Sequence, residues 1–98
     1  MNKFGDLIRT KREEQEMLLR HLSAQLDMDT AMLSKIERGE KTARKEHIKQ
    51  LSKIFNLDYN ELISLWLADK IHLIIKDEKN GLQALEIVEK EYKNISKK

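Results

Sequence analysis

Apolar residues recur along this chain at intervals of three and four positions, with polar residues between them, and this is the period of amphipathic α-helices. The alternation at every second position that would indicate strands is not seen. The pattern therefore predicts an all-α fold. The predicted helices span Lys3–Gln15, Leu18–Leu26, Asp29–Arg38, Lys45–Phe55, Asp58–Ile75 and Leu82–Ile95.

The stretch Leu19–Arg38 holds two short helices joined by a tight turn. Small Ser23 stands where two helix backbones must approach closely, and Asp27 tolerates the left-handed conformation that such a turn often needs. Asp29 can accept a hydrogen bond from a backbone N–H at the start of the second helix, and Gly39 is placed to end that helix. These features suit a helix-turn-helix. Its apolar positions are Leu22, Leu26, Met28, Leu33 and Ile36.

The amino-acid composition argues against disulfides, metal clusters, membrane spans and a secretory signal. The 98 residues contain three glycines, no proline and no cysteine, which favours one helical domain with or without a terminal extension. Disulfides and thiolate metal sites are excluded, and His21, His47 and His72 are too scattered to indicate a metal cluster. No apolar run reaches the length of a membrane span, and residues 1–15 lack the apolar core of a secretory signal. We expect a cytoplasmic protein without a cofactor.

Charge becomes informative only when it is followed along the chain, because the formal net charge is just +2. Between Lys35 and Lys53, seven basic residues stand against three acidic ones, and seven minus three gives a local excess of +4. This excess directly follows the predicted helix-turn-helix. It is either an ordinary solvated face or an electrostatic surface for an acidic partner such as nucleic acid.

Four segments within residues 8–62 resemble the Xre (Cro/C1-type) helix-turn-helix family, which includes phage repressors and the controller proteins of restriction–modification systems. They read IRTKRE, LSAQLDMD, MLSKIERGE and IKQLSKIFNLDYNEL. The IERG tetrad is specific because helix-turn-helix spacing precedes it and a matching helix follows it. The resemblance implies a five-helix lambda-repressor-like domain whose third helix enters the major groove of DNA. To this domain the sequence adds one C-terminal helix for packing or dimerisation.

The resemblance implies DNA contacts from the third helix and the loop after it. A hydroxyl can bond a base edge, a methyl group can touch thymine, and a lysine can donate to guanine. The expected base-reading residues are Thr30, Ala31, Ser34 and Lys35, with Met32, Leu33 and Ile36 left for packing. The expected phosphate contacts are Arg38, Lys41, Thr42, Arg44 and Lys45. The alternatives are that Thr30 is only a first-turn helix residue and that Lys35 is only a solvated charge.

The resemblance also pairs Arg12, late in the first helix, with Glu37 of the IERG tetrad. A bidentate arginine–carboxylate pair would lock the recognition helix onto the first helix, and removing one partner of a buried pair typically costs ~3–5 kcal/mol. The alternative is a pair of exposed charges whose interaction is worth less than ~1 kcal/mol.

The chain departs from the family at the start of the second predicted helix. Relatives commonly have a Ser–Gln pair there, in which the serine caps the helix and the glutamine contacts phosphate or a base. This chain has Leu18 and Leu19 instead, so one polar anchor is missing. Arg20 and His21 are the candidates to replace the lost phosphate contact.

The last third of the chain lies beyond the resemblance. We divide the chain into a DNA-binding domain, residues 1–66, and a C-terminal helical extension, residues 67–98. The segment Leu62–Ile75 has more apolar positions than a small domain can cover, and the last helix adds a seam of its own. A second copy is expected to complete this surface; the alternative is an intramolecular hairpin. The residues assigned to dimerisation are Trp66, Ile71, Ile74, Leu85, Val88 and Tyr92.

Together these features predict a sequence-specific DNA-binding transcriptional regulator that acts as a homodimer on a palindromic operator in double-stranded DNA. The alternative is an antitoxin-like or other interaction module that grips a protein partner through the C-terminal helices. An enzyme is not expected, because no paired carboxylates, nucleophile–base arrangement or phosphate-binding glycine loop stands out.

Overall fold

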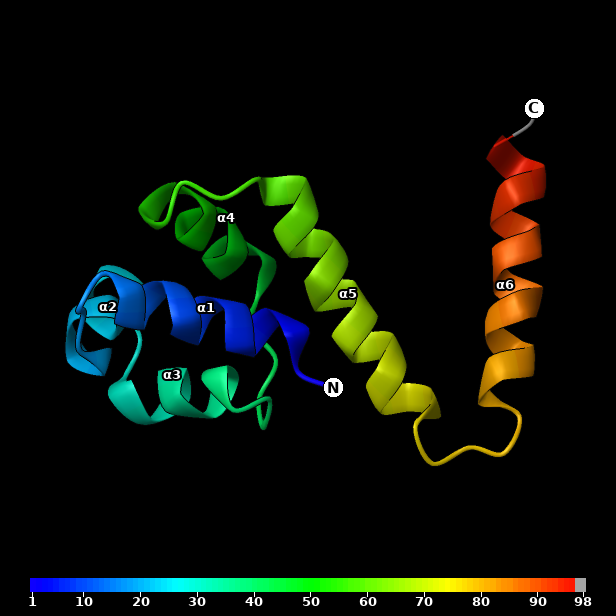
Figure 1. The fold of residues 1–98 in the computed structure, drawn as a ribbon, viewed down its shortest axis with the longest axis horizontal. Coiled ribbons are helices and arrows are strands. Elements are labelled where there is room, and N and C mark those ends of the chain that lie inside the picture. Colours follow the sequence, from blue (N-terminus) through cyan, green and yellow to red (C-terminus); the bar gives the residue numbers. More distant parts are fainter. Residues whose placement is uncertain (97–98) are drawn as a thin grey trace.

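The structure, a computed structural model, describes residues 1–96, which form six α-helices and no strand (Figure 1). The all-α prediction is confirmed, and each predicted helix end lies within one residue of the observed one. The helices are α1 (Lys3–Glu14), α2 (Leu19–Gln25), α3 (Thr30–Glu37), α4 (Lys45–Ile54), α5 (Tyr59–Ile75) and α6 (Gly81–Ser96).

The first five helices pack around one apolar core. Helix α5 contacts both α1 and α4, and α3 contacts both α1 and α2. Because each helix carries apolar residues on one edge, every one of the five contributes at least one side chain with almost no exposed surface. These are Ile8, Leu22, Leu26, Leu33, Ile48, Leu51 and Leu62. The shared core fixes the orientation of α3 relative to the other four helices.

The helices of this bundle end and begin at specific polar residues. Asp27 and Gly39 follow α2 and α3 with φ of 52° and 78°, in the left-handed conformation predicted for them. Asp29 accepts a hydrogen bond from the N–H of Met32 at 2.6 Å, so the predicted cap of α3 is confirmed. Asp58 caps α5 in the same way and is confirmed as well.

Trp66 requires a correction. The sequence assigns it to the dimerisation surface, but its side chain is only 8% exposed and belongs to the core. Its indole Nε1–H donates to the carbonyl of Ala43 at 2.8 Å. Apolar spacing alone could not distinguish the core side of α5 from its outer side, because both sides carry large apolar residues. The helix also continues without a break through the predicted domain boundary after residue 66.

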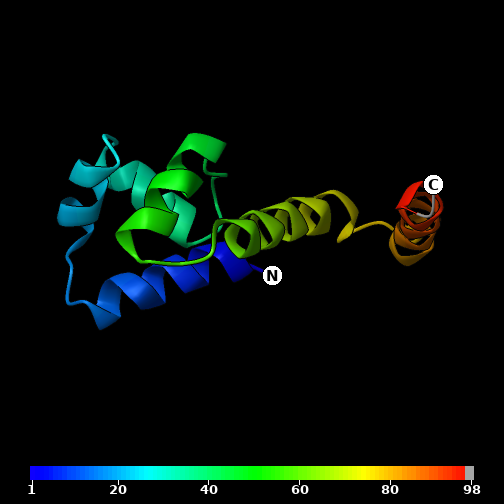
Figure 2. The ribbon, with the colours of Figure 1, turned by 90° about the horizontal axis from the view of Figure 1, so that it is seen from above.

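Helix α6 stands apart from the bundle in both views (Figures 1 and 2). Its apolar side chains remain exposed, as do those on the outer side of the second half of α5. Residues 97 and 98, at the end of the predicted extension, lie outside the described residues. None of the helices within residues 1–96 has the length and apolar character that would let it cross a membrane.

Candidate nucleic-acid interface

Helix α3 buries one side and presents the other to solvent. Leu33, Ile36 and Glu37 are buried. At about 100° per residue, the opposite side carries Ala31 and Lys35, both exposed, with Arg38 just beyond the helix. The polar part of α3 is therefore a ridge anchored from below by three buried side chains. The expected base-reading residues Thr30, Ala31 and Lys35 are exposed, whereas Ser34 is half-buried.

Met32 departs from its predicted role. The sequence leaves it for packing, yet it is 39% exposed. It lies about 200° around the helix from Ser34, on the side of α3 that faces α4. The core therefore covers fewer of the apolar residues of α3 than the sequence pattern predicts. Met32 instead adds an apolar side chain beside the exposed ridge.

Two hollows flank this ridge, one on each side. The first, of about 170 Å³, lies toward α1 and α2 and is lined in part by Arg9, Ser34 and Arg38. The second, of about 300 Å³, lies toward α4 and is lined in part by Lys41 and Arg44. Cationic side chains thus stand on both sides of α3, as the two phosphate backbones of a major groove would require.

Arg9 is a basic residue of this surface that the sequence analysis does not assign. It lines the first hollow together with Arg12 and Arg38. The spacing of three residues between Arg9 and Arg12 is the sequence signal that could have identified it, because that spacing places both side chains on one side of α1.

The expected phosphate-binding residues are accessible. Arg38 pairs with Glu40 at 2.8 Å and Arg44 with Glu46 at 3.4 Å, but all four side chains are more than half exposed. Exposed pairs of this kind are worth less than about 1 kcal/mol, so phosphate can displace the carboxylates. Within residues 1–96 no ion pair joins Lys35, Lys41 or Lys45 to an acidic residue, and Thr42 is exposed between them.

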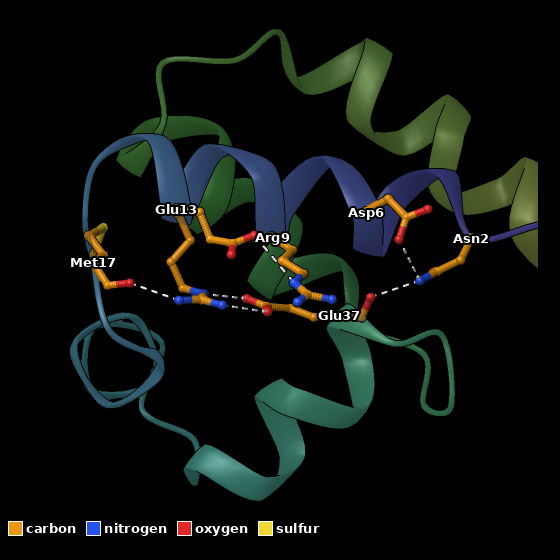
Figure 3. Close-up of polar contacts among 7 residues, drawn as sticks. Asn2, Asp6, Arg9, Glu13, Met17 and Glu37 are labelled. Atoms are coloured by element: carbon orange, nitrogen blue, oxygen red, sulfur yellow. Dashed lines mark hydrogen bonds and ion pairs between the residues drawn. The ribbon is translucent and has the colours of Figure 1, made fainter.

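Arg12 and Glu37 form a bidentate pair beneath the ridge. Arg12 Nε and Nη2 donate to the two carboxylate oxygens of Glu37 at 2.8 and 3.1 Å, and Nη1 donates to the carbonyl of Met17 at 2.8 Å (Figure 3). The side chains are only 12% and 4% exposed. The hydrogen bonds to Glu37 raise the pKa of Arg12 above its ordinary value, although burial acts in the opposite direction. The guanidinium on α1 therefore binds both α3, through Glu37, and the turn between α1 and α2, through Met17.

The N-terminal residues hold the same C-terminal end of α3 through its backbone. Asn2 Nδ2 donates to the carbonyl of Glu37 at 2.7 Å (Figure 3). Gly5 lies so close to α3 that an added Cβ would be 2.6 Å from the carbonyl oxygens of Ile36 and Glu37. Asp69 of α5 accepts from the backbone N–H groups of Lys3 and Phe4 at 3.0 and 2.8 Å, which fixes the start of α1. These contacts were not predicted from the sequence.

The start of α2 shows what stands in place of the missing polar pair. Leu18 is 49% exposed, while Leu19 packs against the core and lines the first hollow. The backbone N–H of Leu18 donates to Nδ1 of His21 at 3.2 Å. A neutral imidazole that accepts at Nδ1 carries its proton on Nε2. His21 therefore supports the helix start and keeps one donor for another group.

The hydroxyl of Thr30 has a partner within the protein. Its Oγ1 lies 3.3 Å from Oγ of Ser23, and Ser23 also donates to the carbonyl of Arg20 at 3.2 Å. A serine hydroxyl has one proton. When Ser23 gives that proton to Arg20, Thr30 must donate to Ser23, and Oγ1 of Thr30 is left able only to accept.

Comparison with protein families identifies the same region. A family model described as helix-turn-helix matches residues 8–62, more than half of the chain. No curated protein and no solved structure matches the chain. No group of three or more His, Asp or Glu side chains within the part of the chain that the structure describes could hold a metal ion.

Proposed function

Because the chain belongs to the Xre (Cro/C1-type) helix-turn-helix family of DNA-binding regulators, we propose that it is a sequence-specific transcriptional regulator that binds a palindromic operator as a homodimer. One observation carries this proposal. Helix α3 is an exposed ridge locked by a buried ion pair and flanked on both sides by cation-bearing hollows. A rigid helix with cations on both flanks is complementary to a major groove and its two phosphate backbones.

The ridge supports a division of roles among its residues. Ala31 presents a methyl group suited to thymine, and Lys35 can donate to the O6 and N7 acceptors of guanine. Thr30, when its proton goes to Ser23, suits the amino group of adenine or cytosine. Ser34 is half-buried and lines the first hollow. It can therefore reach a base edge only where the DNA enters that hollow.

The phosphate-binding role is assigned to Arg38, Lys41, Thr42, Arg44 and Lys45. We add Arg9, which lines the same hollow as Arg38, and the Nε2–H of His21 at the start of α2. Such contacts position the protein but carry no sequence information. They also make affinity fall steeply with salt, by a logarithmic slope of about 0.9 for each phosphate neutralised.

Lys41→Ala tests this role. Binding should weaken for all DNA sequences alike, and the salt slope should fall by about one for each half-site occupied. The matched control is Lys79→Ala, in the turn before α6, which should change neither quantity. A change of sequence preference without a general loss of affinity would contradict the assignment of Lys41 to phosphate.

The operator itself is tested by selecting bound duplexes from a random pool at two salt concentrations. The proposal expects two inverted half-sites with centres about one helical turn, ~34–36 Å, apart. Lys35→Ala should relax the preference at one base pair in each half-site, at a cost of about 1–3 kcal/mol. Enrichment of no common sequence by the wild-type protein would contradict sequence-specific binding.

A second candidate function is an antitoxin-like or other interaction module. The exposed apolar side chains of α5 and α6 favour it, because a surface of this kind marks a contact with another protein. In a homodimeric regulator a second copy of the chain covers that surface, whereas in an interaction module a different protein covers it. A protein that is monomeric by itself and dimerises only with a different chain would favour this second candidate.

A further inference from the structure

The outer side of α5 and most of α6 form an apolar surface that the core does not use. Leu67, Ile71 and Ile74 on α5 are 44%, 43% and 74% exposed. On α6, Leu82, Leu85 and Val88 are 69%, 37% and 51% exposed. Six large apolar side chains on two consecutive helices are thus left in solvent.

We call Leu67, Ile71 and Ile74 the α5 row, and Leu82, Leu85 and Val88 the α6 row. The spacings of the two rows match when one helix is reversed relative to the other. Along α5 the residues are spaced by four and then three positions, and along α6 by three and three. Two helices aligned antiparallel meet through residues at such intervals. An antiparallel pairing of α5 with an α6 would join Leu67 to Val88, Ile71 to Leu85 and Ile74 to Leu82.

The α6 of the same chain does not make this pairing. It follows α5 after residues 76–80 and diverges from it in Figure 1, and in Figure 2 it is seen nearly end-on, apart from the end of α5. Its first residue stays close to the end of α5, since a Cβ added at Gly81 would lie 3.0 Å from the Ile75 carbonyl oxygen. The α5 row and the α6 row therefore do not pack against each other within one chain.

A single neighbouring helix could not cover α6. Ile87, which is 69% exposed, follows Leu85 by two residues and points about 200° away from it around the helix. One partner helix covers a stripe about 100° wide. The apolar residues of α6 therefore need two neighbours, as each helix of a four-helix bundle has, and a hairpin within one chain supplies only one.

The apolar area also suits a second copy. A fully exposed Leu or Ile offers on the order of 100 Å² of apolar surface. Between Leu67 and Ile95, ten large apolar side chains of α5 and α6 are each 37–74% exposed, so together they offer roughly 600 Å² per chain. Two chains offer about 1,200 Å², the lower end of the range for stable interfaces. A two-fold arrangement uses the same surface from both chains without requiring another protein.

We propose that two copies of this chain exchange their last helices, so that α6 of each chain packs antiparallel on α5 of the other and the four helices form one bundle. The proposal rests on the homodimer proposed above and specifies how that dimer is built. The hinge is the polar segment of residues 76–80, which joins two helices that do not pack along each other. Exchange of an identical element is a low-cost route to a symmetric dimer.

Disulfide cross-linking tests the exchange directly, because the chain contains no cysteine. Leu67→Cys and Val88→Cys are prepared as separate single variants, mixed in equal amounts and oxidised. The exchange predicts a covalent heterodimer on a non-reducing gel, and little cross-linking when either variant is oxidised alone. A chain carrying both substitutions should form a covalent dimer.

Two outcomes would overturn the exchange. If the doubly substituted chain runs as a monomer with an internal disulfide, α6 has closed on its own α5. If either single variant forms a covalent dimer by itself, the contact joins two copies of the same helix. Both outcomes are read from the gel, so failure to bind DNA would refute the proposed function without altering the result for the exchange.

Sedimentation at micromolar concentration completes the test. The wild-type chain should be a dimer, and Ile74→Glu should be a monomer because it places a charge in the bundle. Thr10→Glu, which adds the same side chain at an exposed position of α1, is the matched control and should remain a dimer. The emission of buried Trp66 reports whether each variant is folded. A wild-type monomer, or a dimeric Ile74→Glu variant, would refute the exchanged bundle.

Discussion

At the scale of single residues, Glu37 connects the core to the candidate interface. Among the side chains that the structure describes, it is the one charged group that is buried, with 4% of its surface exposed. Its carboxylate holds Arg12, and its backbone carbonyl holds Asn2. The position of α3 thus depends on polar contacts made below the surface that would touch DNA.

Glu37→Gln should therefore destabilise the protein strongly. The substitution leaves the guanidinium of Arg12 buried without its counter-charge, and such a loss costs on the order of 3 kcal/mol. Chemical unfolding followed by the emission of Trp66 measures the change. Glu40→Gln, which breaks the exposed pair with Arg38, is the matched control and should cost less than about 1 kcal/mol. Equal effects of the two substitutions would contradict a special role for the buried pair.

The Arg12 side of this pair should not respond to pH in the ordinary range. A cation whose pKa is raised by folding stabilises the protein fully below its ordinary pKa, and the effect is lost only as pH rises through the raised value. For an arginine both values are strongly alkaline. The destabilisation caused by Glu37→Gln should therefore stay constant between neutral pH and about pH 10. A steady decline of that difference over this range would contradict the expectation.

At the scale of elements, the close approach of α1 to α3 determines where α3 lies relative to the rest of the bundle. Gly5 permits it because a side chain there would meet two backbone oxygens of α3 at 2.6 Å. Helix α5 fixes both ends of this arrangement. Asp69 holds the start of α1, and Trp66 holds the loop after α3 through Ala43. One long helix thus positions α1 and the loop that carries Lys41 and Arg44.

Gly5→Ala tests this contact. Alanine is favoured over glycine in a helix by up to about 1 kcal/mol, but forcing a side chain into a filled space costs about 1–3 kcal/mol. The clash should prevail, because backbone atoms cannot move aside as a flexible side chain would. We expect net destabilisation and weaker DNA binding. Thr10→Ala, at an exposed position of α1, should change stability by no more than about 0.5 kcal/mol. Unchanged or increased stability of Gly5→Ala would show that α1 and α3 can separate freely.

At the scale of the whole molecule, the chain consists of a closed five-helix bundle and a helix that stands outside it. The bundle fixes the candidate DNA surface, whereas α5 extends beyond the bundle and leads to α6 (Figure 1). An apolar surface on the outer part of the molecule can join two copies without covering α3. Two-fold pairing then presents two ridges to one duplex.

The melting temperature should therefore depend on protein concentration. Dissociation of a dimer during unfolding is opposed by mass action, so a tenfold increase in concentration adds about 1.4 kcal/mol per mole of dimer. The midpoint should rise by several degrees for a chain of this size. Ile74→Glu should melt at one temperature whatever its concentration. A wild-type midpoint that does not move with concentration would be inconsistent with a dimer.

The sequence by itself determined the local structure of this protein. Intervals of three and four apolar positions give the six helices, and Asp29, Asp58 and Gly39 mark helix ends through hydrogen bonds or backbone conformations that involve only neighbouring residues. The family assignment followed from motifs of the same local kind, centred on the IERG tetrad. The pairing of Arg12 with Glu37 came from that resemblance alone, because no local rule links residues so far apart.

Only the tertiary structure decided which side of an element becomes core and which remains free. Trp66 and Ile74 are both apolar and belong to the same helix, yet one is buried and the other is 74% exposed. Periodicity shows that a helix has an apolar side, but α5 has two, and the packing of α1 and α4 selects between them. Asn2, Gly5 and Asp69 were missed for a related reason. Each acts on a residue distant in sequence, and such contacts exist only once the helices have packed.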